Sequence, residues 1–142
     1  MRKAVLVIVA GMFLTACSND KPVPQENQIT ERVRPAALGG TTAAYFVYTN
    51  PLEKADTLIA IQADFAAMAQ VHESYETEDG MMGMREQKEV IVQPGEELRF
   101  RQGGLHVMLM NTNRELALGD SVQLGLNFSN AGVVDKKLPV LQ

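Results

Sequence analysis

An imidazole and two thioethers share one face of a predicted strand in the second half of the chain. In the stretch GGLHVMLMN (103–111), leucine and valine alternate with His106, Met108 and Met110. This two-residue period predicts a half-buried β-strand whose leucines and valine face the core and whose other face meets solvent. Because residues two apart project to the same side, about 7 Å apart along the strand, His106 and Met108 can reach one ion without a bend in the backbone.

The only other histidine, His72, lies on the far side of a predicted hairpin turn from a second group of methionines. Asp79-Gly80 is a strong hairpin signal, because its glycine readily adopts a positive φ. The turn lies between His72 and Met84, so the two strands that carry them fold back against each other. The sequence leaves the register of these strands open.

Imidazole and thioether are neutral ligands that favour a soft, singly charged ion. Thioethers suit Cu(I), whereas zinc prefers thiolate, imidazole or carboxylate. Taken singly, each histidine is explained by a local hydrogen bond and each methionine by core packing. Their arrangement is consistent with a copper-binding site of histidine and methionine in a protein outside the cytoplasm.

The spacing of these residues resembles a known signature. The pattern HE-x10-M-x21-HVM (72–108) is similar to the H(M)x10Mx21HxM motif of the periplasmic copper chaperones called PCu(A)C, without a gap. The resemblance runs from about residue 33 to residue 140 and includes TAAYFVYTN, MMGMRE and PGEELRF. It implies a cupredoxin-like β-sandwich that passes copper on, typically to the binuclear centre of cytochrome c oxidase and sometimes alongside Sco-type proteins. The implied ligands of one Cu(I) per chain are His72, Met84, His106 and Met108.

The chain departs from the family pattern in two places. Glu73 stands where the family often has methionine, but we expect it to point to the opposite face of its strand from His72. Many members also have a C-terminal tail rich in histidine and methionine, whereas this chain ends in KKLPVLQ, so a second site there is not expected. Met81, Met82 and Met110 could serve as auxiliary soft ligands, but for each we expect a packing or rim position.

The N-terminus has the features of an export signal. A basic pair is followed by an apolar run that is too short for a membrane-spanning helix (1–16). The ending Leu-Thr-Ala-Cys resembles the lipobox of bacterial lipoproteins, which implies lipidation of Cys17, the only cysteine. Ser18 stands where an aspartate would signal inner-membrane retention, so the resemblance favours the outer membrane of a two-membrane cell envelope.

Composition restricts the class of protein further. Without the signal peptide, 126 residues remain with 11 basic and 17 acidic side chains, a net charge of −6. This length suits one domain (31–142) behind a proline-containing tether (17–30). The acidic balance argues against nucleic-acid binding. Acylation of Cys17 would leave no thiol for a disulfide or a thiolate metal site.

The rest of the chain reads as short strands separated by turn residues. Two of them alternate clearly, at 97–101 and 122–128, and no helical stripe of comparable length appears. The segment 63–69 is compatible with one helical turn or with a bulged strand. The prediction is an all-β, cupredoxin-like Greek-key β-sandwich in a single domain. Its expected strands are Ala43–Thr49, Thr57–Gln62, Ala69–Glu76, Met82–Gln87, Val90–Val92, Glu97–Arg101, Leu105–Met110, Val122–Phe128 and Val133–Val140.

Three other classes of function are alternatives to a copper chaperone without catalytic activity. A structural or interaction lipoprotein could use the same face to bind a protein partner. A blue-copper redox enzyme is disfavoured, because such sites use a cysteine thiolate and the only cysteine is in the lipobox. A hydrolase is disfavoured as well, because neither histidine has a recognisable serine or cysteine partner motif.

Overall fold

The computed structural model describes residues 29–142. The predicted signal peptide, the predicted lipidation site Cys17 and nearly all of the predicted tether lie outside the described residues. Within 29–142, no helix has the length and apolar character needed to cross a membrane. The elements are β1 (Arg32–Val33), β2 (Thr41–Thr49), β3 (Asp56–Gln62), β4 (Ala66–Glu76), β5 (Met82–Glu86), β6 (Val90–Val92), β7 (Glu97–Phe100), β8 (Leu105–Thr112), β9 (Ser121–Phe128) and β10 (Gly132–Pro139).

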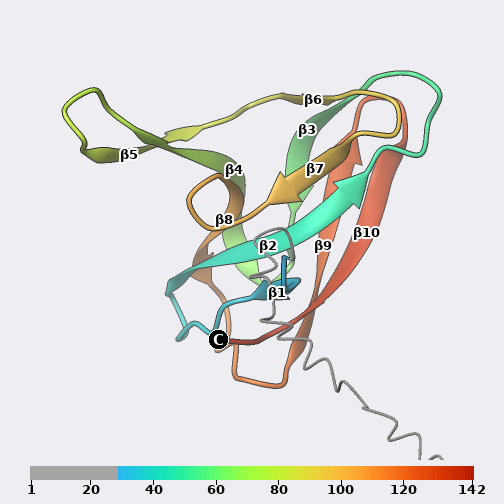
Figure 1. Ribbon diagram of the computed structural model, residues 1–142. Coiled ribbons are helices and arrows are strands. Elements are labelled where there is room, and N and C mark those ends of the chain that lie inside the picture. The colour runs from blue at the N-terminus through green and yellow to red at the C-terminus, as the bar shows by residue number, and fades with distance from the viewer. Residues whose placement is uncertain (1–28) are drawn as a thin grey trace, which may run out of the picture.

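The strands form two antiparallel sheets that pack face to face (Figure 1). One sheet has the order β1-β2-β8-β4-β5, with β7 paired to the second half of β2. The other has the order β10-β9-β3-β6. The predicted all-β sandwich is therefore confirmed, and β8, which carries the sulfur-rich stretch, lies in the interior of the first sheet.

The core lies between the sheets and follows the period-two pattern. Along β9, Leu124, Leu126 and Phe128 are at most 2% exposed, as their alternation with polar residues predicted. Across the sandwich, the ring of Tyr48 on β2 stacks on Phe128 with a centroid distance of 4.4 Å. Burial of these side chains stabilises the sandwich by about 1.5–3 kcal/mol per large apolar side chain.

Two segments differ from the expected elements. β1 was not predicted, because a strand of two residues is too short to show a period. The segment 63–69 is neither a helical turn nor a bulged strand: a turn at 64–65 is followed by β4, which begins at Ala66. Phe65 in this turn is 2% exposed, so the turn also buries an aromatic ring in the core.

β4 and β5 form a hairpin that extends beyond the sandwich (Figure 1). Its turn is the predicted one: Gly80 has φ of 77°, and its N–H donates to the carbonyl of Thr77 at 2.9 Å. In the observed register, Ser74 lies opposite Met84 and His72 opposite Glu86. The turn and this register together decide where Met84 is placed.

A glycine and an aromatic ring keep the two arms of the hairpin close together. Gly83 lies opposite Tyr75, and a Cβ atom at Gly83 would be 2.6 Å from Cζ of the Tyr75 ring. The guanidinium of Arg85 lies 5.3 Å from the centre of the same ring. It also pairs with Glu73 at 2.7 Å. These contacts hold β5, the edge strand that carries Met84, against β4.

Candidate metal centre

The two histidines lie directly opposite each other on the paired strands β4 and β8. His72 and His106 are register partners, and their ring centroids are 6.1 Å apart with an interplanar angle of 60°. Directly opposite residues of an antiparallel pair project to the same face of the sheet. The pairing therefore places both imidazoles on the outer face of the first sheet, away from the core.

The two methionines of the motif lie on the same outer face. Met108 follows His106 by two residues on β8, and Met84 lies on β5 opposite Ser74, which follows His72 by two residues on β4. The side-chain period of two puts all of them on one side of the sheet. The structure thus brings the four residues of the predicted ligand set onto one face.

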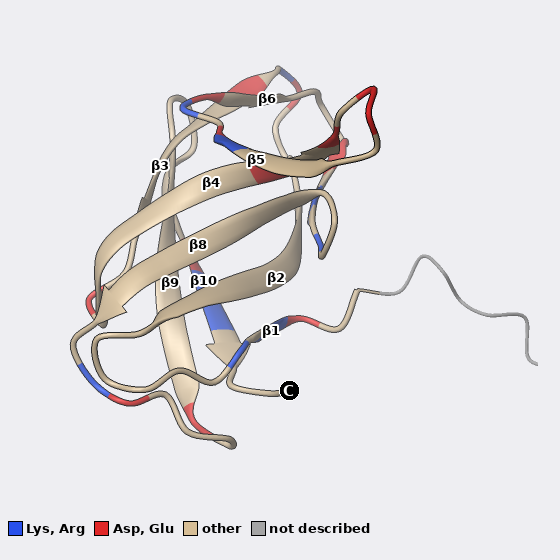
Figure 2. Cartoon of the chain, turned by 90° about the vertical axis from the view of Figure 1, so that its left-hand side faces the viewer, with Lys and Arg blue, Asp and Glu red and all other residues tan. Residues whose placement is uncertain are grey.

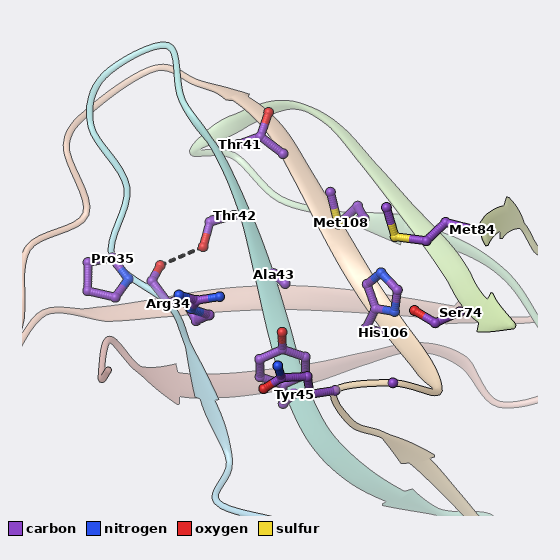
Figure 3. Close-up of a pocket in the computed structure, with 12 residues that line it drawn as sticks. Arg34, Pro35, Thr41, Thr42, Ala43, Tyr45, Ser74, Met84, His106 and Met108 are labelled. Carbon is purple, nitrogen blue, oxygen red and sulfur yellow. Dashed lines mark hydrogen bonds between the residues drawn. The ribbon is translucent and has the colours of Figure 1, made fainter. Parts of the chain in front are cut away.

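Three of these residues line a single cavity of about 410 Å³. Figure 3 shows the thioethers of Met84 and Met108 next to each other, with the His106 ring close to both. Tyr45 and Ser74 also line this cavity. His72 lies beside the cavity on β4, with its ring against the edge of His106.

Exposure varies sharply among the predicted ligands. Met84 is 60% exposed at the sheet edge, whereas His106 is 5% exposed. The expectation that this whole face meets solvent is therefore wrong for His106. Paired strands flank His106 on both sides, and the loop that precedes it folds back against its ring. The candidate site has a buried side and an open side.

Hydrogen bonds assign the tautomers of both rings. Nδ1 of His106 lies 2.9 Å from the carbonyl oxygen of Gly104, which can only accept, so Nδ1 carries the proton and Nε2 is the nitrogen left to bind a metal. Nε2 of His72 donates to Oε1 of Gln70 at 3.2 Å, which leaves Nδ1 as the nitrogen of His72 with a lone pair available for a metal. A metal-ligating histidine usually donates its second ring N–H to such an acceptor.

Gln70 is a further residue of the candidate site that the sequence motif does not include. Its Nε2 donates to a carboxylate oxygen of Glu86 at 3.1 Å, so its amide orientation is fixed and Oε1 is directed toward His72. Gln70 also lies opposite Met108 in the register of β4 and β8. A signal was available, because Gln70 precedes His72 by two residues and so shares its face.

Glu73 points away from the site, as expected. It accepts hydrogen bonds from Arg85 at 2.7 Å and from Gln87 at 2.9 Å on the opposite face of the hairpin. Among residues 29–142, no group of three or more His, Cys, Asp or Glu side chains is arranged to hold a metal ion. Any metal centre built from the predicted ligands therefore depends on thioether sulfur, which selects for soft ions.

Comparison with known proteins places the chain in a family. Residues 27–140 match the family described as "Putative lipoprotein LpqE-like". The chain belongs to this family. A protein of Leifsonia xyli subsp. xyli (strain CTCB07), named "Putative lipoprotein Lxx21020", is 26% identical over an alignment of 147 positions that covers 97% of this chain and 88% of that protein. Both names are those of lipoproteins, in agreement with an envelope-associated protein.

The LpqE-like chain has the fold of PCuAC domains. The apo PCuAC domain of PmoF1 superposes with a TM-score of 0.64 at 22% identity, over 78% of this chain and 88% of that domain. The copper-bound PCuAC domain of PmoF2 gives 0.59 at 21% identity, over 79% and 89%. The Cu(I) form of DR1885 from Deinococcus radiodurans gives 0.56 at 24% identity, over 78% and 75%. The predicted cupredoxin-like sandwich and the resemblance to PCu(A)C proteins are confirmed.

Proposed function

We propose that this LpqE-like protein is an extracytoplasmic metallochaperone without catalytic activity, which holds one Cu(I) and transfers it to a partner protein. The proposed ligands are Nδ1 of His72, Nε2 of His106 and the thioethers of Met84 and Met108. The observation that carries the proposal is the alignment of the two imidazoles opposite each other, with both thioethers on the same face. Two neutral imidazoles and two thioethers match the preferences of Cu(I).

The position of the site supports transfer rather than permanent storage. His106 is buried and Met108 is half-buried, whereas Met84 lies on the edge strand β5 and is 60% exposed. An incoming ligand from an acceptor can therefore reach the ion from the side of Met84 and replace that thioether first. The exchange needs no proton transfer at sulfur, because a thioether binds without deprotonation.

The acceptor and the location follow from the same proposal. The acceptor is a copper-receiving protein, either the copper-centre subunit of cytochrome c oxidase or a Sco-type protein. A lipid on Cys17 anchors the chain to the cell envelope, in the outer membrane if the host has two membranes. The lipoprotein names of the family and of the Leifsonia relative support the anchor.

An anaerobic Cu(I) competition titration against a chromophoric chelator tests the ligand set. We expect one equivalent to bind, with X-ray absorption reporting two nitrogen and two sulfur neighbours. The double variant Met84→Leu with Met108→Leu should lose this binding. Met81→Leu is the matched control, because Met81 is 64% exposed at the hairpin turn and outside the site. No binding by the wild-type protein would overturn the proposal and leave this face as a protein-binding surface.

A transfer assay tests the chaperone role. Cu(I)-loaded protein is mixed with the soluble domain of a Sco-type protein or of the copper-centre subunit, and the metal content of each is measured after separation. We expect copper in the acceptor. Retention of all copper by the donor in both mixtures would indicate a buffer rather than a chaperone.

A further inference from the structure

A second pair of methionines lies on the outer face, two residues along β4 and β8 from the pair formed by Gln70 and Met108. Met68 on β4 is directly opposite Met110 on β8. The residues that separate this pair from Gln70 and Met108 are Ala69 and Leu109, which are themselves register partners and face the core. The sulfur-bearing side chains of Met68 and Met110 therefore project to the same side as Met108.

The geometry brings three thioethers within reach of one ion. Directly opposite residues have Cβ atoms about 4.5–5.5 Å apart, and diagonal neighbours lie about 7–8 Å apart. Met68 is directly opposite Met110 and diagonal to Met108, while Met108 and Met110 are two residues apart on one strand. Methionine has three rotatable bonds, so its sulfur can move by several ångströms without a change in the backbone.

Core packing does not account for this pair. Met68 is 51% exposed, and Met110 is only half-buried. On the strands beside them, Thr41 lies opposite Met110 and Gln70 lies opposite Met108, whereas the other partner of Met108 is the small Ala43, so no large apolar side chain lies opposite these methionines on β2. Met68 also borders a groove of about 300 Å³, from which solvent reaches its side chain. Neither side chain is fully buried, so an ion in solution can approach the pair from the side of Met68.

The strands that carry the pair are uncharged near it, and the charged side chains at the edge are Glu86 and Lys88, which line the groove beside Met68. β2 and β8 contain no Lys, Arg, Asp or Glu, and neither does β4 from Ala66 to His72, as the uncoloured strands in Figure 2 show. The Glu86 carboxylate on the neighbouring strand is already hydrogen-bonded to Gln70. The donors of the pair itself are neutral sulfurs, which select a soft, singly charged ion over a hard divalent one.

We propose that Met68, Met110 and Met108 form a second, thioether-only site for Cu(I), and equally for Ag(I), next to the site with the two histidines. The second site binds more weakly than the first, because it has no imidazole. Met108 is common to both sites. An ion held by Met68 and Met110 can therefore pass to His106 and Met84 by exchanging one ligand at a time, with Met108 bound throughout.

Titration with Ag(I), a redox-stable substitute for Cu(I), tests the second site. The protein carries ¹³C-labelled methionine methyl groups, and their NMR signals are followed as Ag(I) is added. We expect the first equivalent to shift Met84 and Met108. The second should shift Met68 and Met110 and move Met108 again, because Met108 is common to both sites. In the variant Met68→Leu with Met110→Leu, the second step should disappear and the first should remain. Leucine keeps the bulk of these exposed side chains, and backbone amide spectra verify the fold.

Met81→Leu is the control, and it should retain both steps. A single step with unmoved methyl signals of Met68 and Met110 overturns the second site, as does a second step that persists in the double leucine variant. This outcome is distinct from failure of the proposed function. Ag(I) can shift the methyl signals of Met68 and Met110 while the ring signals of His72 and His106 stay unchanged. That result would support the second site and contradict the proposed site with the two histidines.

Discussion

His72 and His106 face each other across β4 and β8, with their ring centroids 6.1 Å apart. Both strands are paired on each side, so the two imidazoles are held by the interior of the sheet. Met108 shares this position, whereas Met84 comes from the edge strand β5. The candidate site therefore combines three proposed ligands on strands of the sheet interior with one proposed ligand at an open edge, a division that suits both binding and release.

Loss of the edge thioether should weaken copper binding without affecting the fold. We expect Met84→Leu to lower the Cu(I) affinity at least tenfold, or about 1.4 kcal/mol, because the ion loses one of two sulfurs. The temperature of unfolding of the metal-free protein should not change, because Met84 is 60% exposed and contributes little to the core. Chelator competition and thermal unfolding give the two measurements. Equal affinity in Met84→Leu and wild type would show that Met84 is not a ligand.

Gln70 should act on copper through His72. We expect Gln70→Ala to lower the Cu(I) affinity by about tenfold, the lower end of the range for loss of a hydrogen-bond partner behind a ligating histidine. The ¹⁵N signals of the His72 ring should change from one tautomer to a mixture, an effect that a loss of packing alone would not produce. Gln87→Ala is the matched control, because Gln87 donates to Glu73 on the opposite face of the same hairpin. An unchanged His72 tautomer in Gln70→Ala would contradict this role.

The ring of Tyr75 should secure the strand that carries Met84. Tyr75→Ala exposes the backbone at Gly83 and removes a cross-strand contact worth about 1 kcal/mol at most. We expect backbone amides of β5 to exchange with solvent up to about fivefold faster, and the Cu(I) affinity to fall by a similar factor. Tyr75→Phe should behave as wild type, because it keeps the ring over Gly83. Identical exchange rates in the alanine and phenylalanine variants would exclude this function of the ring.

A buried carboxylate should make the sandwich sensitive to acid. Asp56 is 1% exposed, and it accepts hydrogen bonds from the hydroxyl of Ser129 and from the backbone N–H groups of Thr57, Asn130 and Ala131. Burial by itself raises the pKa of Asp56, but these hydrogen bonds outweigh it and lower the pKa from 3.8 to about 2.

Because the folded state lowers this pKa, the ionised carboxylate stabilises the fold above about pH 4, and the stabilisation is lost as the pH falls toward 2. The contribution at neutral pH is about 2 kcal/mol. We expect Asp56→Asn to lower the free energy of unfolding by at least this amount at pH 7, and by much less near pH 2. Denaturant unfolding at both pH values measures the difference. Asp135→Asn, at an exposed position of β10, is the control and should change little.

Residue types and spacing were enough to predict the faces of the strands. The ligand set was implied by the resemblance to the PCu(A)C signature, and it stays a prediction. His106 and Met108 fall on the outer face of their sheet because the side-chain period of a strand is two. For the same reason, the leucines of β9 fall together on the core face of the second sheet. The turn at Asp79-Gly80 was predictable because it requires a positive φ, which glycine adopts without strain. These are local properties, and the sequence carries them directly.

Only the tertiary structure decided which residues lie opposite one another. A period of two fixes the face of a side chain but not its partner on the next strand, so the positions of Ser74 opposite Met84 and of Met68 opposite Met110 could not be read from the chain. The burial of His106 depends in the same way on β4, a strand distant in sequence that lies beside it in the sheet. The sequence determined which groups could bind a soft ion, and the pairing of β4, β5 and β8 determined which of them meet.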